Sequence, residues 1–170
     1  AGAGAKVFQK AADGSVTLAS RLLLWPYRIG AKINLWAWTR TLPPKVPVAD
    51  GVFLGRFPTA SEASGFGTVI DLAAELERPG GASCRWISLA VLDLLPPSEA
   101  KLAEAVPAIE TARRQGTVLI CCALGFQRSA TVAVEWLVGT GRSHTQAQAQ
   151  KLLAASGRPV HIHAGANEAA

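Results

Sequence analysis

Between residues 46 and 157, short apolar runs alternate with longer segments in which apolar residues recur every three or four positions. The runs predict strands at 52–54, 68–72, 86–89 and 117–122, and the periodic segments predict helices at 59–64, 98–115, 129–139 and 144–155. The runs "TVID" and "TVLICC" are almost continuously apolar, which is typical of strands buried on both faces. We therefore expect an α/β fold with a central buried sheet flanked by helices.

A different pattern occupies residues 15–42 and predicts an extra N-terminal amphipathic helical segment. Ser15 is predicted to cap this helix, and Pro26 is predicted to kink or divide it. No apolar run approaches the roughly 18 residues that a transmembrane helix needs. The stretch "PPKVP" at 43–47 is predicted to be a linker. We therefore divide the chain into residues 1–45, a leader with this segment, and residues 46–170, a folded domain. Six apolar residues of the segment follow helical spacing: Leu18, Leu22, Trp25, Ile29, Ile33 and Trp36.

Two interpretations of this apolar stripe stay open. The stripe could pack the helix against the rest of the protein. Alternatively, basic residues interleaved with tryptophans, here Arg21, Lys32, Trp25, Trp36 and Trp38, are typical of a helix that lies on an anionic membrane surface. The second interpretation would give the chain a membrane partner through residues 15–42.

The amino-acid composition restricts the classes of binding partner and the cellular compartment that we expect. The 170 residues include 49% hydrophobic and 17% charged residues, which is typical of one globular protein, and the net charge of +5 indicates an anionic partner. Nucleic acid is disfavoured, because the positive charges are scattered and no recognition motif is present. Three cysteines without disulfide spacing favour a reducing compartment. We expect a cytoplasmic location, at the cytoplasmic face of a membrane if residues 15–42 bind lipid.

Residues 117–139 carry the main candidate for a functional site. The buried run "TVLICC" leads into the loop "ALGFQ" and then into a helix that starts near Ser129. In this order, the N–H groups of the loop and the positive end of the helix dipole form a cradle for an anion. Gly125 permits a loop shape that a β-carbon would obstruct, and the Arg128 guanidinium can hold the anion through two hydrogen bonds.

A thiol at the bottom of this cradle predicts a reaction class. In that field Cys122 should lose its proton readily, and its thiolate is placed for in-line attack on phosphorus. The expected chemistry is phosphoryl transfer to cysteine and then to water. Ser129 can donate a hydrogen bond to the thiolate and make it a better leaving group in the second step.

The octapeptide from Cys122 to Ser129 matches the signature C-x5-R-[ST]. Over roughly residues 46–157 the chain resembles the dual-specificity branch of the cysteine-dependent protein tyrosine phosphatases. The resemblance implies that family's fold, Cys122 as nucleophile and Arg128 as phosphate clamp, with no cofactor and no metal. It also implies that phosphate is bound by the loop residues Ala123, Leu124, Gly125, Phe126, Gln127 and Arg128.

One position departs from the family pattern. A histidine usually precedes the nucleophile and helps to order the loop, whereas this chain has Cys121. Cys121 is either a small buried residue at the end of a strand or a redox partner that links to Cys122 or Cys84 under oxidation.

The family's general acid is an aspartate on an upstream loop, and Asp93 in "ISLAVLDLLPPSEA" occupies the matching position. The flanking leucines at 92, 94 and 95 are expected to shield this carboxyl group from water and so keep a proton available near neutrality. Three other carboxylates, at the end of a different strand, are expected to have structural or substrate-orienting roles: Asp71, Glu75 and Glu77.

The loop also informs the choice of substrate. The absence of a cation in "ALGFQ" disfavours a highly phosphorylated headgroup and favours a single phosphomonoester, while Phe126 is expected to form an apolar lip. We therefore expect a phosphatase that acts on a phosphoprotein or a phospholipid. The segment at 15–42 adds a resemblance to bacterial membrane proteins in which such a domain follows a hydrophobic segment. A phosphate-binding protein without turnover and a thiol redox protein stay open as alternatives. The histidines at 144, 161 and 163 lack partners at ligand spacing, so no metal site is expected.

Overall fold

The computed structural model describes residues 4–162, and its centre is a mixed sheet of five strands in the order β1-β2-β5-β3-β4. β1 pairs antiparallel with β2, and the other neighbours are parallel. The carboxyl ends of β2 to β5 therefore share one edge of the sheet, where ligands of α/β proteins commonly bind. The strands are β1 (Lys45–Ala49), β2 (Val52–Arg56), β3 (Thr68–Ala73), β4 (Arg85–Val91) and β5 (Val118–Cys122).

The four predicted strands are confirmed, and every position of β3 and β5 is buried, as expected for central strands. The linker predicted at 43–47 is wrong in part, because Lys45–Ala49 is strand β1. Pro47 is tolerated there because β1 lies at the edge of the sheet, where a missing N–H leaves no inner strand unpaired. The division of the chain at residue 45 into leader and domain stays a prediction.

The four helices predicted after residue 46 are confirmed, and their N-terminal caps explain where they begin. Thr59 and Glu62 form a capping box, while Ser98 and Thr145 accept hydrogen bonds from the first turns of their helices. The helix that contains Pro107 continues through it. The elements are α3 (Ala60–Ser64), α4 (Glu99–Arg113), α5 (Arg128–Gly139) and α6 (Gln146–Ala154).

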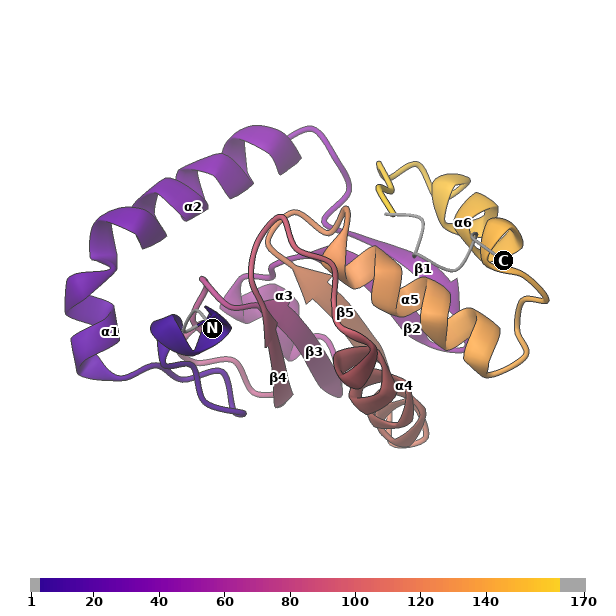
Figure 1. Ribbon diagram of the computed structural model, residues 1–170, viewed down its shortest axis with the longest axis horizontal. Coiled ribbons are helices and arrows are strands. Elements are labelled where there is room, and N and C mark those ends of the chain that lie inside the picture. The colour runs from indigo at the N-terminus through magenta and orange to yellow at the C-terminus, as the bar shows by residue number, and fades with distance from the viewer. Residues whose placement is uncertain (1–3, 163–170) are drawn as a thin grey trace.

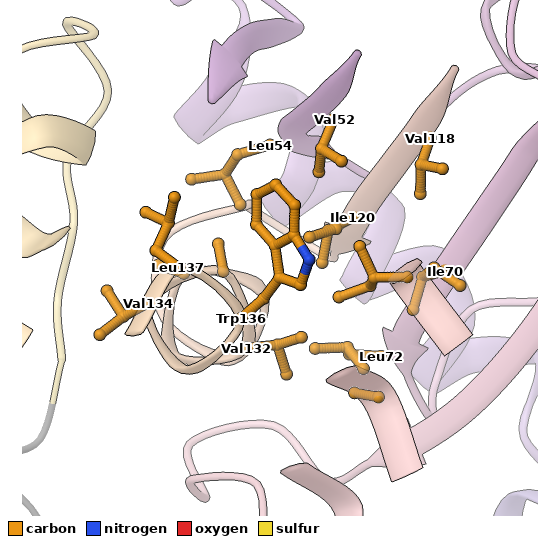
Figure 2. Close-up of a cluster of buried hydrophobic side chains, with 14 of the residues drawn as sticks. Val52, Leu54, Ile70, Leu72, Val118, Ile120, Val132, Val134, Trp136 and Leu137 are labelled. Carbon is orange, nitrogen blue, oxygen red and sulfur yellow. The ribbon is translucent and has the colours of Figure 1, made fainter. Parts of the chain in front are cut away.

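The main hydrophobic core lies between the sheet and α4, α5 and α6, with α5 in contact with both other helices (Figure 1). Trp136 of α5 is fully buried and points among aliphatic side chains from three strands (Figure 2). A second cluster, on the opposite face of the sheet, includes Phe57, Phe66 and Trp86, and Ala31 and Leu35 of the N-terminal segment pack against it. Burial on both faces holds the central strands rigidly beneath the loops that follow them.

The N-terminal segment forms α1 (Leu18–Leu23) and α2 (Trp25–Thr39) after a short 3-10 helix, η1 (Gly4–Phe8). Pro26 lies in the first turn of α2, so the predicted division of the helix is confirmed. The predicted cap is wrong: Thr17, and not Ser15, accepts the hydrogen bond from Ser20 N–H. Ser15 instead bonds with Asp13 in the preceding turn. No helix within residues 4–162 is long and apolar enough to cross a membrane.

The apolar stripe of α1 and α2 faces solvent. Its six residues are between 47% and 68% exposed, and the helix contacts the protein instead through the face that carries Arg28, Ala31, Leu35 and Thr39. The interpretation that the stripe packs on the rest of the protein is therefore wrong. On that other side, Arg28 lies 3.7 Å from Glu77 and donates a hydrogen bond to the Ser20 hydroxyl at 3.2 Å. We call the six residues the apolar stripe: Leu18, Leu22, Trp25, Ile29, Ile33 and Trp36.

Candidate active site

The loop at 123–127 joins the carboxyl end of β5 to the first turn of α5, as the sequence predicts. Gly125 has φ +77°, in the left-handed region, and a β-carbon there would lie 2.5 Å from the Gly55 carbonyl oxygen. Two independent constraints, backbone conformation and space, therefore require glycine at this position. The loop consequently curls tightly over the end of β2.

Cys122 lies at the bottom of this loop and is almost fully buried. Its Sγ accepts hydrogen bonds from the Gly125 N–H, at 3.2 Å, and from the Ser129 hydroxyl, at 3.3 Å. The structure therefore brings Cys122, Gly125 and Ser129 together as the sequence predicts.

Arg128 is 2% exposed, and its guanidinium is held from one side by a buried carboxylate. Its two terminal nitrogens donate to the two oxygens of Glu75 at 2.9 and 2.7 Å, and Nη1 also donates to the Val91 carbonyl at 2.9 Å. Burial by itself would lower the pKa of Arg128, but the Glu75 hydrogen bonds and the nearby Cys122 sulfur offset it, so the pKa is raised. Arg128 is a permanent cation with a fixed orientation.

Asp93 lies on the loop after β4, and its Oδ1 is 2.9 Å from Arg128 Nη2. The structure therefore brings the proposed acid to the same guanidinium that faces the nucleophile. The expected shielding by the neighbouring leucines is wrong, because Leu94 and Leu95 point into solvent and the Asp93 side chain is 47% exposed. Leu94 has φ +63°, a strained conformation for a bulky residue.

Cys121 is a buried strand residue, as one of the two interpretations states. It packs in the second cluster, whereas Cys122 packs in the main core, because successive residues of a strand point to opposite faces. This alternation disfavours a disulfide between the two. Burial, reinforced by the charge of Asp71, raises the pKa of Cys121 well above that of a free thiol, so this thiol is protonated at neutral pH.

Two residues outside the signature hold the site. Glu75 has the structural role that the sequence analysis expects, and its position beside Arg128 follows because β3 neighbours β5 and segments that follow parallel strands meet at one edge. Arg158 is the residue that sequence reasoning missed. It donates to the Leu124 carbonyl of the loop at 2.5 Å and also to the Pro43 carbonyl. No local pattern marks Arg158, since its loop partner lies 34 positions earlier.

The remaining predicted residues divide between the loop and the surface. Phe126 is half-buried between Arg158 and His161, whose N–H donates to the Phe126 carbonyl at 2.9 Å. Gln127 is the N-cap residue of α5, and its buried side-chain nitrogen has no hydrogen-bond partner within residues 4–162. His144 is exposed before α6, and residue 163 lies outside the described residues. Within the described part of the chain, no group of three histidine, cysteine or acidic side chains is placed to hold a metal ion.

The comparisons with known proteins agree with this geometry. No protein-family model matches the sequence, and no curated protein matches it. Solved structures do match. Tk-PTP in its active form is 25% identical with a TM-score of 0.63, over 72% of this chain and 89% of that chain. PTPMT1 in complex with PI(5)P is 16% identical with a TM-score of 0.63, and the match covers 72% of this chain and 88% of that chain. Human DUSP28 is 24% identical with a TM-score of 0.56, and the match covers 72% of this chain and 87% of that chain.

The chain is a cysteine-dependent phosphatase, and its fold is that of the dual-specificity and protein tyrosine phosphatases. The central sheet of this phosphatase and its flanking helices have the fold that the resemblance implies. The side chains that define the C-x5-R-[ST] signature lie in one site. The Ser129 hydroxyl donates a hydrogen bond to Cys122 Sγ, and Glu75 fixes the orientation of the Arg128 guanidinium.

The phosphatase also carries a side chain from α2 near its active site. Burial, with smaller contributions from the negative charges of Glu75 and Asp93, raises the pKa of the Tyr27 phenol. The Tyr27 ring packs on Phe8, with ring centroids 5.6 Å apart. The N-terminal helices therefore border the catalytic edge of the sheet.

Proposed function

We propose that the phosphatase hydrolyses a phosphomonoester through a phosphocysteine intermediate, and that its substrate is a phospholipid at an anionic membrane surface. The observation that carries the catalytic part is the contact of Cys122 Sγ with the Gly125 N–H and Ser129 hydroxyl, beside a locked Arg128. The observation that carries the choice of lipid is the exposed apolar stripe.

Phosphate binding rearranges one ion pair. The four Nη hydrogens of Arg128 face Glu75, the Val91 carbonyl and Asp93, and its Nε–H has no partner within residues 4–162. A phosphate can accept one hydrogen bond from Nε–H and a second from the Nη2 hydrogen that otherwise points to Asp93. Its arrival therefore releases the Asp93 carboxyl, which turns to the leaving oxygen.

The first step forms a phosphorus–sulfur bond as the phosphorus–oxygen bond to the leaving group breaks. Asp93 gives its proton to the leaving oxygen, so that an alcohol departs. In the second step water attacks the phosphocysteine, Asp93 accepts a proton from that water, and the thiolate leaves with inorganic phosphate as the product. The Ser129 hydroxyl, already 3.3 Å from Sγ, stabilises the departing thiolate.

The exposed apolar residues and the cations of α1 and α2 support membrane binding through the apolar stripe. The stripe presents two tryptophans and four aliphatic residues to solvent, and Trp38 beside it is also exposed. Cations on the same helices, Arg21, Lys32 and Arg40, complement anionic headgroups. The solved relatives do not decide between lipid and protein, because PTPMT1 is described with PI(5)P and P. aeruginosa TpbA with pTyr.

The test compares phosphate release by wild type and Cys122→Ser on phosphatidic acid in anionic vesicles and on phosphotyrosine and phosphoserine peptides. We expect release from vesicles that exceeds release from peptides and is abolished in Cys122→Ser. Ile33→Asp should impair vesicle binding and vesicle hydrolysis, whereas Leu152→Asp on α6, a matched exposed position, should not. Preference for peptides would overturn the lipid assignment, and absence of release from all substrates would favour a phosphate-binding protein without turnover.

A further inference from the structure

A lysine from the N-terminal segment is buried beside the central sheet, and neither catalytic step uses it. Lys10 lies in the turn between η1 and α1, where it forms an isolated β-bridge with Val16. Its side chain has no exposed surface. Burying an ammonium group is costly unless each of its hydrogens finds an acceptor and its charge finds a partner. The partners of Lys10 therefore indicate what the protein gains from this arrangement.

The partners of Lys10 lie at the carboxyl end of β3. Its Nζ donates to Asp71 Oδ2 at 2.5 Å and to the Ala73 carbonyl at 2.6 Å. The Asp71 side chain is also fully buried, and it accepts further hydrogen bonds from the Trp86 indole at 3.0 Å and from the Ala73 N–H at 2.9 Å. Lys10 therefore supplies the only cation of this network and ties together two residues at the point where β3 ends.

The chain that leaves this end of β3 leads directly to the phosphate clamp. The pairing of β3 with β4 shifts register just before Ala73, so the regular ladder does not fix this point by itself. The Ala74 N–H donates to the Val91 carbonyl at 3.3 Å, and the same carbonyl accepts a hydrogen bond from Arg128. Glu75 follows, and it holds both terminal nitrogens of Arg128. The lysine thus bonds the backbone two residues before the carboxylate that orients the guanidinium.

The turn that carries the lysine is itself docked on the sheet. The Ser88 N–H of β4 donates to the Ala12 carbonyl at 2.8 Å, and the Arg78 N–H donates to the Gly14 carbonyl at 3.0 Å. Gly14 has φ +81°, and a β-carbon there would lie 2.5 Å from the Trp86 indole nitrogen. Only glycine allows so close an approach in this conformation. The turn therefore presents its lysine to β3 from a fixed position.

The network also borders the strand that carries the nucleophile. Asp71 is paired in register with Cys121, the residue before Cys122. Burial raises the pKa of Asp71, and the Lys10 ammonium is the largest influence in the opposite direction. Without the lysine, the carboxyl group would take up a proton or remain as an unpaired buried charge beside β5. Either change would loosen the end of β3.

Resting on the proposed function, we infer that Lys10 is a positioning residue for phosphoryl transfer: it fixes the carboxyl end of β3, and thereby the Glu75 carboxylate that orients Arg128. Lys10 acts through Glu75 and not by contact with the phosphate. The N-terminal segment, which precedes β1, therefore contributes to the catalytic geometry in addition to carrying the apolar stripe.

The experiment measures phosphate binding and turnover separately, on the full chain. The readouts are the Kd of inorganic phosphate by calorimetry, kcat and KM on p-nitrophenyl phosphate, and the melting temperature. The variants are Lys10→Met, Glu75→Gln and the double variant that combines them. Lys6→Met, at an exposed lysine of η1, is the matched control. Ile109→Ala, which removes a buried side chain of the main core, is the control for lost stability alone.

We expect Lys10→Met to raise the Kd of phosphate about fivefold and to lower kcat/KM about tenfold, because the guanidinium is no longer held in its binding orientation. Lys6→Met should behave as wild type. Ile109→Ala should lower the melting temperature but change the phosphate Kd less than about twofold. In the Glu75→Gln background, Lys10→Met should raise the Kd less than about twofold further, because the route to Arg128 is already broken. Additive losses in this cycle, or an equal loss in Ile109→Ala, would mean that Lys10 merely stabilises the fold, and would overturn the inference.

A second variant keeps the test decisive if Lys10→Met does not fold. Lys10→Met with Asp71→Asn removes the unpaired buried charge but still leaves the Ala73 carbonyl without its donor. We expect this variant to fold and to retain the raised phosphate Kd. Recovery of the wild-type Kd would assign the effect to the charge of Asp71 and would overturn the positioning role.

The two proposals fail in different ways. If wild type hydrolyses p-nitrophenyl phosphate through Cys122 and Lys10→Met does so equally well, the positioning role is wrong and the proposed function stands. If wild type binds phosphate but shows no Cys122-dependent turnover, the proposed function is wrong, while the phosphate Kd of Lys10→Met still decides whether the lysine orients the clamp. Absence of phosphate binding by wild type would overturn both.

Discussion

Glu75 holds Arg128 through two parallel hydrogen bonds of 2.9 and 2.7 Å in the interior of the protein. The two residues are 53 positions apart, and each is at most 3% exposed at its side chain. A charge pair this deeply buried contributes less to stability than to geometry, because desolvation offsets most of the attraction. Its consequence is that the guanidinium plane is already oriented when the phosphate arrives.

Replacing Glu75 should damage both turnover and stability. In Glu75→Gln one oxygen acceptor becomes a donor that faces the guanidinium, and the buried charge of Arg128 loses its main partner. We expect kcat/KM on p-nitrophenyl phosphate to fall at least about tenfold and the free energy of unfolding to fall by about 3 kcal/mol. The control is Glu104→Gln, which removes an exposed pair with Lys101 and should cost no more than about 0.5 kcal/mol. Unchanged kcat/KM would refute the orienting role.

Replacing Asp93 should produce a loss that depends on the leaving group. Asp93→Asn cannot donate a carboxyl proton, so hydrolysis of an alkyl phosphate should slow by roughly 100-fold. Hydrolysis of p-nitrophenyl phosphate should slow much less, since nitrophenolate leaves without protonation. Glu99→Gln, an exposed carboxylate in the first turn of α4, is the control. Equal losses on both substrates would show that Asp93 is not the acid.

Arg158 should act through the loop that it holds. Arg158→Lys keeps the charge but cannot reach the Leu124 and Pro43 carbonyls with two separate nitrogens. We expect kcat/KM to fall about tenfold and the inhibition constant for inorganic phosphate to rise by a similar factor, because the loop N–H groups are displaced. A purely structural role would lower the melting temperature without weakening phosphate binding.

The core helices should respond to acid through Glu110. Hydrogen bonds from Arg113 and from the Trp136 indole lower the pKa of Glu110 from its ordinary 4.5 to about 2. Because the folded-state pKa is depressed, the stabilisation is present above pH 4.5 and is lost as the pH falls toward 2. At pH 7 the free energy of unfolding of wild type should exceed that of Glu110→Gln by about 1 kcal/mol, a figure that allows for the partial exposure of the pair to solvent. Urea unfolding at several pH values measures this, and a difference that persists unchanged at pH 2 would contradict it.

Sequence patterns anticipated the layered fold because the relevant signals are local. Continuous apolar runs mark β3 and β5, and the threonine and serine caps mark the starts of α3, α4 and α6. β1 escaped prediction because two prolines precede it and one lies within it, a composition that indicates a linker unless the strand is known to lie at an edge.

The orientation of α2 escaped prediction for a different reason. A helical stripe indicates that one face is apolar, but it does not say what covers that face. Here the opposite side, with Arg28, Ala31 and Leu35, faces the protein, and the apolar stripe faces solvent. Hydrophobic periodicity alone cannot predict this choice, because the residues that α2 contacts are distant in the chain.

The sequence by itself determined the strand, loop and helix that place Cys122, Gly125, Arg128 and Ser129, since these residues are contiguous and their backbone shape follows from local chemistry. The tertiary structure alone decided which carboxylate locks Arg128, which arginine holds the loop, and that the cations of α1 and α2 enclose a cavity beside Glu75. Those pairings join residues 34 to 56 positions apart. The pairing of Glu75 with Arg128 exists because parallel strands bring their carboxyl ends together, a relationship that depends on strand order and that no short stretch of sequence encodes.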